Sequence, residues 1–348
     1  MMMTEKIEQV LQKSAKKNKT LQFAMHLPES GTRYSFSSTK PDQRFHSASV
    51  GKLMTGTLTF MAIEQGKLSL DAKVAGILKK GMLDKLFVFE NVDYQGEVMI
   101  RHLLGHTSGV NDYFGSKAFD GSSFTEDMIR NPDTFWTPNT MLDYTREKQK
   151  ALSRPGEKFF YSDTGYVLLG LIIEEVFKMP FYQALETYFF EPAGMKHTHL
   201  CFYSEGFDQK ALGPTYINGV DVHLFRSLSA DFSGGGLSTT TEDLLKFLDA
   251  LQNGKFISQS SLDRAAGFTH RYRQGLHYGL GMMQIHFEEF FFMLKNLPRV
   301  QGHLGVTGVH AWYDPKSKGM FVLNVGNTKD MASSFRLLIK ILQIVYRK

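Results

Sequence analysis

Strand-like segments lie mainly near the two ends of this 348-residue chain, and the stretch between them has few strand signals and the spacing of helices. Near the start, residues 21–27 and a second run around Tyr34–Phe36 indicate two strands joined by a Glu-Ser-Gly turn. Near the end, short apolar runs bounded by turn residues predict four more strands, at Tyr278–Phe287, Phe290–Leu294, Val309–Asp314 and Met320–Val325. We therefore expect one antiparallel sheet built from both chain ends, with a large helical insertion between them.

Helical periodicity covers much of the remaining chain. Apolar residues recur at helical spacing after Ser49, and Gly66 is a typical stop signal, so we expect a helix from Ser49 to about Gln65. Further helices are expected over residues 4–17, Tyr166–Phe177, Phe181–Phe190, Thr241–Leu251 (capped by Thr240 or Thr241) and Ser333–Tyr346. The expected fold class is α+β, an α/β sandwich in two domains. Residues 1–72 and 231–348 form the sheet-plus-helices domain, and residues 73–230 form a mainly helical domain, with the functional site between them.

Composition excludes several classes of protein. The single cysteine, Cys201, rules out a disulfide within the chain and a thiolate metal cage. No run of about 18 apolar residues is present, so no membrane-spanning helix is expected. Residues 1–19 carry charges where a signal peptide needs an apolar core, so we expect a cytoplasmic protein. The net charge of +5 is spread along the chain, which argues against nucleic-acid binding, and the oligomeric state stays open.

Ser-x-x-Lys pairs supply the first chemical signal. A serine hydroxyl becomes a nucleophile when a base lies within hydrogen-bond reach and donors await the oxyanion. Ser14–Lys17 lies in a polar basic stretch, and Ser37–Lys40 precedes Pro41, which favours a turn. Only Ser49–Lys52 opens an apolar helix, where the amine can lie beside the hydroxyl and the helix end offers free N–H groups. This context selects the third pair as the candidate.

Five segments then resemble one family, in that family's order and over nearly the whole chain. The segment FHSASVGKLMTGTLTFMAIEQGKLSLDAKV resembles the active-serine region of the penicillin-binding-protein and class C β-lactamase family of serine hydrolases. IRHLLGHTSGV resembles its histidine-threonine-serine-glycine segment, and PGEKFFYSDTGYVLLGLIIEEV resembles its tyrosine motif. Two later family segments resemble GGGLSTTTEDLLKFLDAL and GHLGVTGVHAWYDPKSKGMFVLNVGN.

The resemblance implies a β-lactamase/transpeptidase-like fold and an acyl-enzyme hydrolase that uses no cofactor or metal. Ser49 would attack an ester or amide carbonyl, and Lys52 would help to activate it. Tyr161 would be the general base or proton relay and would later activate the deacylating water. A phenol normally titrates near pH 10, and Lys52 and His303 are the cations that could lower its pKa.

The third motif of the family resembles the stretch from His303 to Gly305, which would lie on a strand facing Ser49. The resemblance implies that these residues help to bind substrate. The oxyanion hole would be formed by the backbone N–H groups of Ser49 and Val306.

Two positions depart from the family pattern. The tyrosine motif ends in Asp163 where the family usually has Asn, and an ionised Asp cannot donate a hydrogen bond to a substrate amide. Asp163 can still hold Lys52 in place. Leu304 stands where the family usually has a hydroxyl that helps to bind the substrate carboxylate. Both changes disfavour penicillins and D-Ala-D-Ala peptides and fit an ester or another small acyl substrate.

Other patterns favour structural roles. His102 and His106 have a spacing that can bind zinc, but they lack the Glu of a His-Glu-x-x-His motif, and the family segment accounts for both. Gly234–Gly236 lacks the Lys of a phosphate loop and is expected to form a tight turn near the site. The aromatic cluster Phe290–Phe292 is expected to be a core strand rather than a lipid-binding patch.

The leading interpretation is a serine hydrolase for a small-molecule ester, amide or β-lactam. Esterase, β-lactamase and D,D-carboxypeptidase or D-aminopeptidase activities are not ranked. An acyltransferase of the same fold and a non-hydrolysing acylation sensor are the alternatives.

Overall fold

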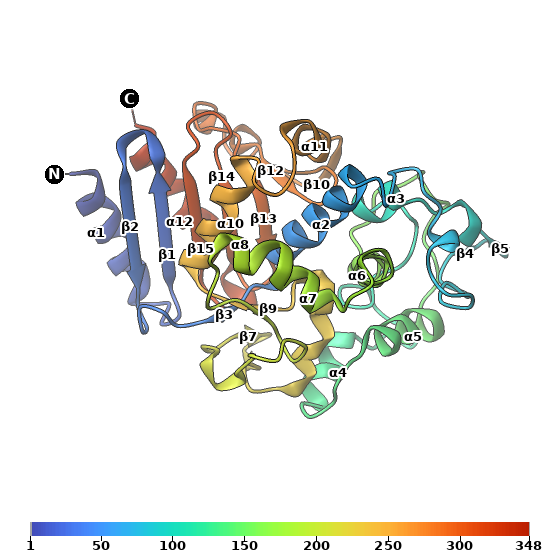
Figure 1. Cartoon of the computed structure of the whole chain (residues 1–348). Coiled ribbons are helices and arrows are strands. Elements are labelled where there is room, and N and C mark those ends of the chain that lie inside the picture. Colours follow the sequence, from blue (N-terminus) through green and yellow to red (C-terminus); the bar gives the residue numbers. More distant parts are fainter. Residues whose placement is uncertain (1, 348) are drawn as a thin grey trace.

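The main sheet joins the two ends of the chain, as predicted. The computed structural model describes residues 2–347. Its eight strands are antiparallel and lie in the order β10 (His270–Arg273), β11 (Leu276–Tyr278), β12 (Met283–Ile285), β13 (Gln301–Gly305), β14 (Val309–Tyr313), β15 (Met320–Asn324), β1 (Gln22–Leu27) and β2 (Thr32–Ser37). The register pairs Phe23 with Leu323, so that the first strand of the chain completes a sheet formed by its last third. Both termini lie at the end of the molecule that holds β1 and β2 (Figure 1).

Helices cover both faces of the sheet. On one face α1 (Met3–Ala15) packs against α12 (Met331–Val345), and on the other α10 (Thr241–Gln252) lies across β1, β14 and β15 (Figure 1). Side chains alternate between the two faces of a strand, so that in β15 Phe321 and Leu323 join the core beneath α1 and α12. Met320 and Val322 join the larger core on the opposite face. This layering confirms the predicted α/β sandwich.

A helical region adjoins one end of the sheet (Figure 1). It is built around two long buried helices, α2 (Lys52–Glu64) and α6 (Asp163–Phe177), which pack against each other. The other helices are α3 (Ile100–Leu104), α4 (Phe124–Arg130), α5 (Pro138–Lys148), α7 (Phe181–Leu185), α8 (Glu191–Ala193), α9 (Phe232–Gly235) and α11 (Gln259–Ala265). Small sheets are formed by β3 (Phe45–His46), β9 (Leu237–Thr239) and β6 (His199–Leu200), by β4 (Val88–Phe89) and β5 (Val92–Asp93), and by β7 (Tyr216–Ile217) and β8 (Val220–Asp221). Within residues 2–347, every helix is too short or too polar to cross a membrane.

Two local predictions near the sheet are wrong. The strand expected over Tyr278–Phe287 is divided into β11 and β12 because residues 279–282 form a turn, in which Gly281 has a φ of +88°. The strand expected over Phe290–Leu294 consists of 3-10 turns, and Phe291 and Phe292 are 56% and 70% exposed. Phe290 packs on Phe335, with ring centroids 5.7 Å apart. The aromatic cluster is therefore not a core strand.

The predicted helix after Ser49 begins differently from expectation. A 3-10 turn (Ala48–Gly51) contains the serine, and the α-helix starts at Lys52. The turn lies against α9, where a Cβ on Gly51 would come within 2.6 Å of the Gly235 Cα. Gly235 itself has a φ of +145°, and a Cβ there would lie 1.9 Å from the Ala48 carbonyl oxygen. The tight turn predicted over Gly234–Gly236 is instead the end of α9 and its C-cap, and the absence of a side chain on Gly235 lets α9 contact the backbone beside Ser49.

Gly235→Ala is expected to destabilise the protein, because both its φ and the contact with Ala48 exclude a side chain. Forced shifts of this kind in a packed region cost about 1–3 kcal/mol or more. Urea unfolding followed by circular dichroism measures the change. Gly76→Ala is the control, because no atom lies within 4 Å of a Cβ at that position. Equal stability of the two variants would contradict this account of the turn.

Candidate active site

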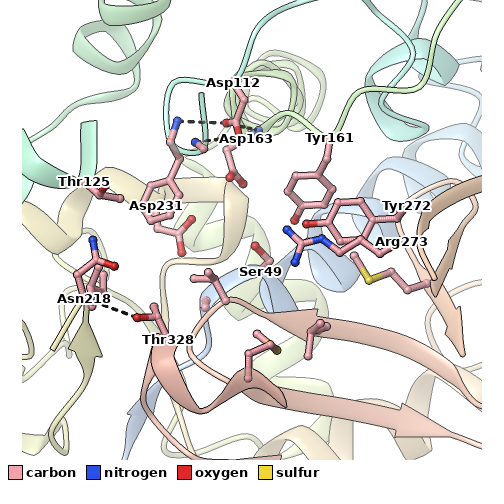
Figure 2. Close-up of a pocket in the computed structure, with 18 residues that line it drawn as sticks. Ser49, Asp112, Thr125, Tyr161, Asp163, Asn218, Asp231, Tyr272, Arg273 and Thr328 are labelled. Carbon is pink, nitrogen blue, oxygen red and sulfur yellow. Dashed lines mark hydrogen bonds between the residues drawn. The ribbon is translucent and has the colours of Figure 1, made fainter. Parts of the chain in front are cut away.

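Ser49 opens into a pocket of about 340 Å³ at the junction of the sheet and the helical region. Three other residues of the pocket come from separate segments: Tyr161 from the loop before α6, Asp231 from the turn before α9, and Arg273 from β10. Figure 2 shows the phenol oxygen of Tyr161 pointing toward Ser49. The fold therefore brings one serine hydroxyl together with a phenol, carboxylates and a guanidinium.

Lys52 lies beside the serine and is fully buried. Its Nζ donates to Ser49 Oγ at 3.1 Å and to the carbonyl oxygen of Gly234 at 2.6 Å, and it forms a close ion pair with Asp163 Oδ1. An ammonium group has three N–H donors, and each has an acceptor here. A buried charge is tolerated when it is paired and hydrogen-bonded in this way.

Asp163 is held in place by the start of α6. The Ser162 hydroxyl accepts from the Gly165 N–H at 3.3 Å and caps the helix, and the Asp163 N–H donates to Asp112 Oδ1 at 3.0 Å. The sequence-based expectation that Asp163 holds Lys52 agrees with this geometry.

Tyr161 differs from expectation in its acid–base behaviour. Burial raises the pKa of its phenol well above the usual value of 10, and the negative charge of Asp163 and the nearby Tyr272 raise it further. A hydrogen bond with Ser49 acts in the opposite direction but is the smaller effect. Lys52 Nζ lies 5.1 Å from the ring centroid and does not reverse the shift. At neutral pH the resting phenol therefore carries its proton.

His303 does not supply the expected second cation. Its side chain is fully buried behind the pocket wall, where Nε2 is hydrogen-bonded to the Tyr278 hydroxyl at 3.1 Å. Burial, and then the charge of Lys52, lower the pKa of His303 to about 3, so the ring is neutral at neutral pH. Leu304, the next residue, lines the pocket in its place. The expectation that His303 contacts substrate does not fit this placement.

The predicted oxyanion region lies at the end of β13. A Cβ on Gly305 would lie 2.8 Å from the Ser47 carbonyl oxygen, so this glycine allows the strand to approach the serine turn. Val306 follows directly, is 42% exposed and lines the pocket with Ser49. The role of the Ser49 and Val306 N–H groups stays a prediction.

Sequence reasoning missed a histidine that positions the phenol. The His106 ring packs against the ring of Tyr161 with centroids 4.2 Å apart and the planes tilted by 32°, and its Nδ1 accepts from the Ser162 N–H at 3.1 Å. Burial lowers the pKa of His106 well below 6.5, so it is a neutral packing partner. Its position in the segment GHTSG, which resembles a family motif, was the sequence feature that could have identified His106 as part of the site.

Two carboxylic acids of the pocket were also missed. Asp112 accepts from the N–H groups of Asp163 and Gly115, and Asp231 lies on the neighbouring wall. Burial, with a further contribution from the charge of Asp163, raises the pKa of Asp112 and of Asp231 to about 7. For Asp231 the charge of Lys52 opposes this rise. Neither residue has a local pattern that distinguishes it from a loop aspartate.

A possible metal-ligand group exists elsewhere in the described chain. Among residues 2–347, the one set of at least three suitable side chains is His277, His286 and Glu289, with ligand atoms within 4.8 Å of one another. Glu289 is already hydrogen-bonded to His277 at 2.6 Å and paired with Arg271 at 3.2 Å. His102 and His106 do not belong to this set. None of its members lines the Ser49 pocket.

A family model described as Beta-lactamase matches residues 12–343. The chain belongs to the Beta-lactamase family. Penicillin-binding protein 4* of Bacillus subtilis (strain 168) is 32% identical over 243 residues, which are 65% of this chain and 49% of that protein. The chain thus spans about half the length of the curated relatives it matches.

Solved structures share the fold of this Beta-lactamase family member over nearly its whole length. The D-amino acid amidase from Ochrobactrum anthropi SV3 has a TM-score of 0.79 at 22% identity, covering 97% of this chain and 99% of its own. EstCE1, a hydrolase with promiscuous acyltransferase activity, has a TM-score of 0.76 at 20% identity, covering 99% and 98%. These likenesses confirm the predicted β-lactamase/transpeptidase-like fold.

The raised pKa of Asp231 predicts a pH-dependent effect of Asp231→Asn on stability. The folded protein holds the Asp231 proton up to about pH 7, whereas the unfolded chain releases it near 3.8. The wild type therefore loses stability as the pH rises from about 4 to 7, and the Asn variant lacks this contribution. The free energy of unfolding of Asp231→Asn should rise relative to wild type between pH 5 and pH 8 in urea titrations. The exposed Asp133→Asn should show no such trend, and a trend of opposite sign would refute the assignment.

Proposed function

We propose that this protein is a serine hydrolase that cleaves an ester or amide through an acyl-enzyme on Ser49. The observation that carries the proposal is the 3.1 Å hydrogen bond between Ser49 Oγ and Lys52 Nζ, with Lys52 held by Asp163 beside an open pocket. The phenol of Tyr161 stands at the same pocket and supplies a second proton-transfer group. Membership of the Beta-lactamase family supports the same chemistry.

The contacts of Lys52 define the acylation step. Ser49 Oγ bonds to the carbonyl carbon while Lys52 accepts the serine proton and passes one of its own to Asp163, its close partner. The bond to the leaving group then breaks, and Tyr161 gives its phenol proton to that group. Because burial keeps this phenol protonated, Tyr161 begins the cycle as an acid rather than as a base.

Deacylation reverses these transfers. Tyr161 is now a phenolate and takes a proton from the attacking water. The bond between Ser49 Oγ and the acyl carbon breaks, Lys52 returns a proton to Oγ, and Lys52 recovers its own proton from Asp163. The backbone N–H groups of Ser49 and Val306 are proposed to stabilise the oxyanion in both steps.

Two residues direct the choice of substrate class. Leu304 lines the pocket with an apolar side chain, and Asp163 is committed to Lys52, so neither offers a donor to a substrate carboxylate or amide. We therefore propose a small acyl ester or amide as substrate rather than a penicillin or a D-Ala-D-Ala peptide. The amidase and the EstCE1 hydrolase that share the fold fit this direction.

The function is tested with a substrate panel and a covalent probe. Short-chain nitrophenyl esters and acyl nitroanilides should be hydrolysed, a chromogenic cephalosporin and D-Ala dipeptides should be poor substrates, and a fluorophosphonate should add to Ser49 by intact mass. Ser49→Ala should abolish both turnover and the adduct. Turnover that survives in Ser49→Ala would refute the nucleophile, and a stable adduct without turnover would favour an acylation sensor. Absence of both adduct and turnover would refute the hydrolase.

Tyr161→Phe is expected to slow nitrophenyl acetate turnover by about 100-fold or more, because it removes the proton-transfer group. With this activated ester the leaving group needs little protonation, so a burst of one nitrophenol per enzyme should precede slow deacylation. Stopped-flow absorbance measures both phases. Tyr188→Phe is the control, since its ring packs on Phe177 away from the pocket. Unchanged steady-state turnover in Tyr161→Phe would contradict the proposed role.

A further inference from the structure

Charge is distributed unequally around Ser49. Figure 2 shows the carboxylates of Asp163 and Asp231 on one side of the serine, with Asp112 above Asp163 in this view, and the guanidinium of Arg273 on the other side with Tyr161. An elongated substrate that reaches both walls would therefore meet carboxyl groups at one end and a positively charged guanidinium at the other.

The acidic side holds more carboxylates than its one lysine can pair. Asp231 Oδ1, Asp163 Oδ1 and Lys52 Nζ lie 3.0, 3.1 and 3.5 Å from a single point, the position that a Cβ on Gly234 would take. The lysine directs its three N–H groups to Ser49, Asp163 and Gly234. The positive charge of Lys52 acts on Asp231, but Lys52 donates no hydrogen bond to the Asp231 carboxylate.

Asp231 has no other donor within the described chain. Among residues 2–347, no N–H or O–H group donates a hydrogen bond to its carboxylate. The nearest basic atom is His46 Nε2, 4.0 Å from Oδ2, which is too far for a hydrogen bond. Burial lowers the pKa of His46 to about 4, so that ring is uncharged at neutral pH. The Asp231 side chain is 17% exposed, and it faces the pocket.

A carboxylate without a donor or counterion in a partly buried site is unfavourable, and a ligand cation that supplies both relieves this. A primary ammonium group offers a positive charge and three N–H donors. We propose that Asp231 is the anchor for a primary ammonium group carried by the substrate, close to the carbonyl that Ser49 attacks. The proposal rests on the proposed hydrolase function and names the substrate class: aminoacyl esters or amides.

The arrangement also assigns the ammonium to the acyl part of the substrate. Tyr161, the proposed proton donor to the leaving group, lies on the Arg273 side of Ser49, so the leaving group points there (Figure 2). The acyl part then extends toward Asp231. Arg273 would repel an ammonium on its own side, which reinforces this orientation.

Pairs of substrates of equal size, one charged and one neutral, test the effect of the substrate ammonium group. Glycine 4-nitroanilide and propionyl 4-nitroanilide have acyl groups of the same size, one ending in an ammonium and the other in a methyl group. β-Alanine and butyryl 4-nitroanilides extend both by one methylene. The wild type should prefer the ammonium member of at least one pair by about tenfold in kcat/KM at about pH 7.5, where the α-amino group is still mostly protonated, as expected for a charge-assisted hydrogen bond.

Asp231→Asn keeps the shape of the side chain and removes its charge. It should lower the ratio of kcat/KM for the ammonium substrate to kcat/KM for its uncharged partner by about tenfold or more. Asp133→Asn, which removes an exposed carboxylate away from the pocket, should leave this ratio unchanged. An equal loss for both members of a pair would show that Asp231 is only structural, and a wild-type preference for the uncharged member would overturn the proposal.

A binding measurement tests the ammonium site even if the enzyme turns these substrates over too slowly to assay. Glycinamide should protect Ser49 from fluorophosphonate labelling, its uncharged isostere propionamide should protect less, and Asp231→Asn should remove the difference. If Ser49 is labelled but the two amides protect equally, the ammonium site is refuted while the hydrolase proposal stands. If Ser49 is neither labelled nor able to turn over any ester, the hydrolase proposal itself fails.

Discussion

The proposed active centre depends on a buried ammonium group. Lys52 has no exposed surface, and its charge is stable there only because Ser49, Asp163 and Gly234 each provide an acceptor. These acceptors come from the turn before α2, from the first residue of α6 and from α9. Satisfying one lysine therefore requires α6 and α9 to meet the start of α2, and α2 packs against both of these helices.

How far the sequence predicts this molecule depends on whether a residue's partners are local. The helix over Thr241–Leu251 was predictable because its apolar residues recur with helical spacing. The helix around Tyr166–Phe177 and the strands β14 and β15 were predictable as apolar runs, long for the helix and short and bounded by turn residues for the strands, and these runs are buried almost throughout. The strand predicted over Phe290–Leu294 is wrong because strand propensity reflects side chains that pack on a sheet surface, whereas Phe292 is mostly exposed.

The site divides in the same way. Ser49 and Lys52 are three residues apart, so their spacing predicts that the two side chains are in contact. The family motif predicts the position of Asp163. Asp231 and His106 act through neighbours more than 50 residues away in sequence, which no local pattern encodes. Family membership also does not fix acid–base state. The expected depression of the Tyr161 pKa counted nearby cations and omitted burial and the charge of Asp163, which together are the stronger influence.

The aspartate at position 163 links the catalytic group to the proposed specificity. An asparagine there would leave Lys52 with an unbalanced positive charge that Asp231 could offset. With Asp163 in place, the lysine already has a close acidic partner. Burial, and to a smaller extent the charge of Asp163, raise the pKa of Asp231 to about 7. One change of an amide to an acid thus alters both the proton relay and the charge that the pocket presents to a substrate. The proposed ammonium-bearing acyl group would restore this balance, so the proposal couples substrate selection to the proton relay through Lys52.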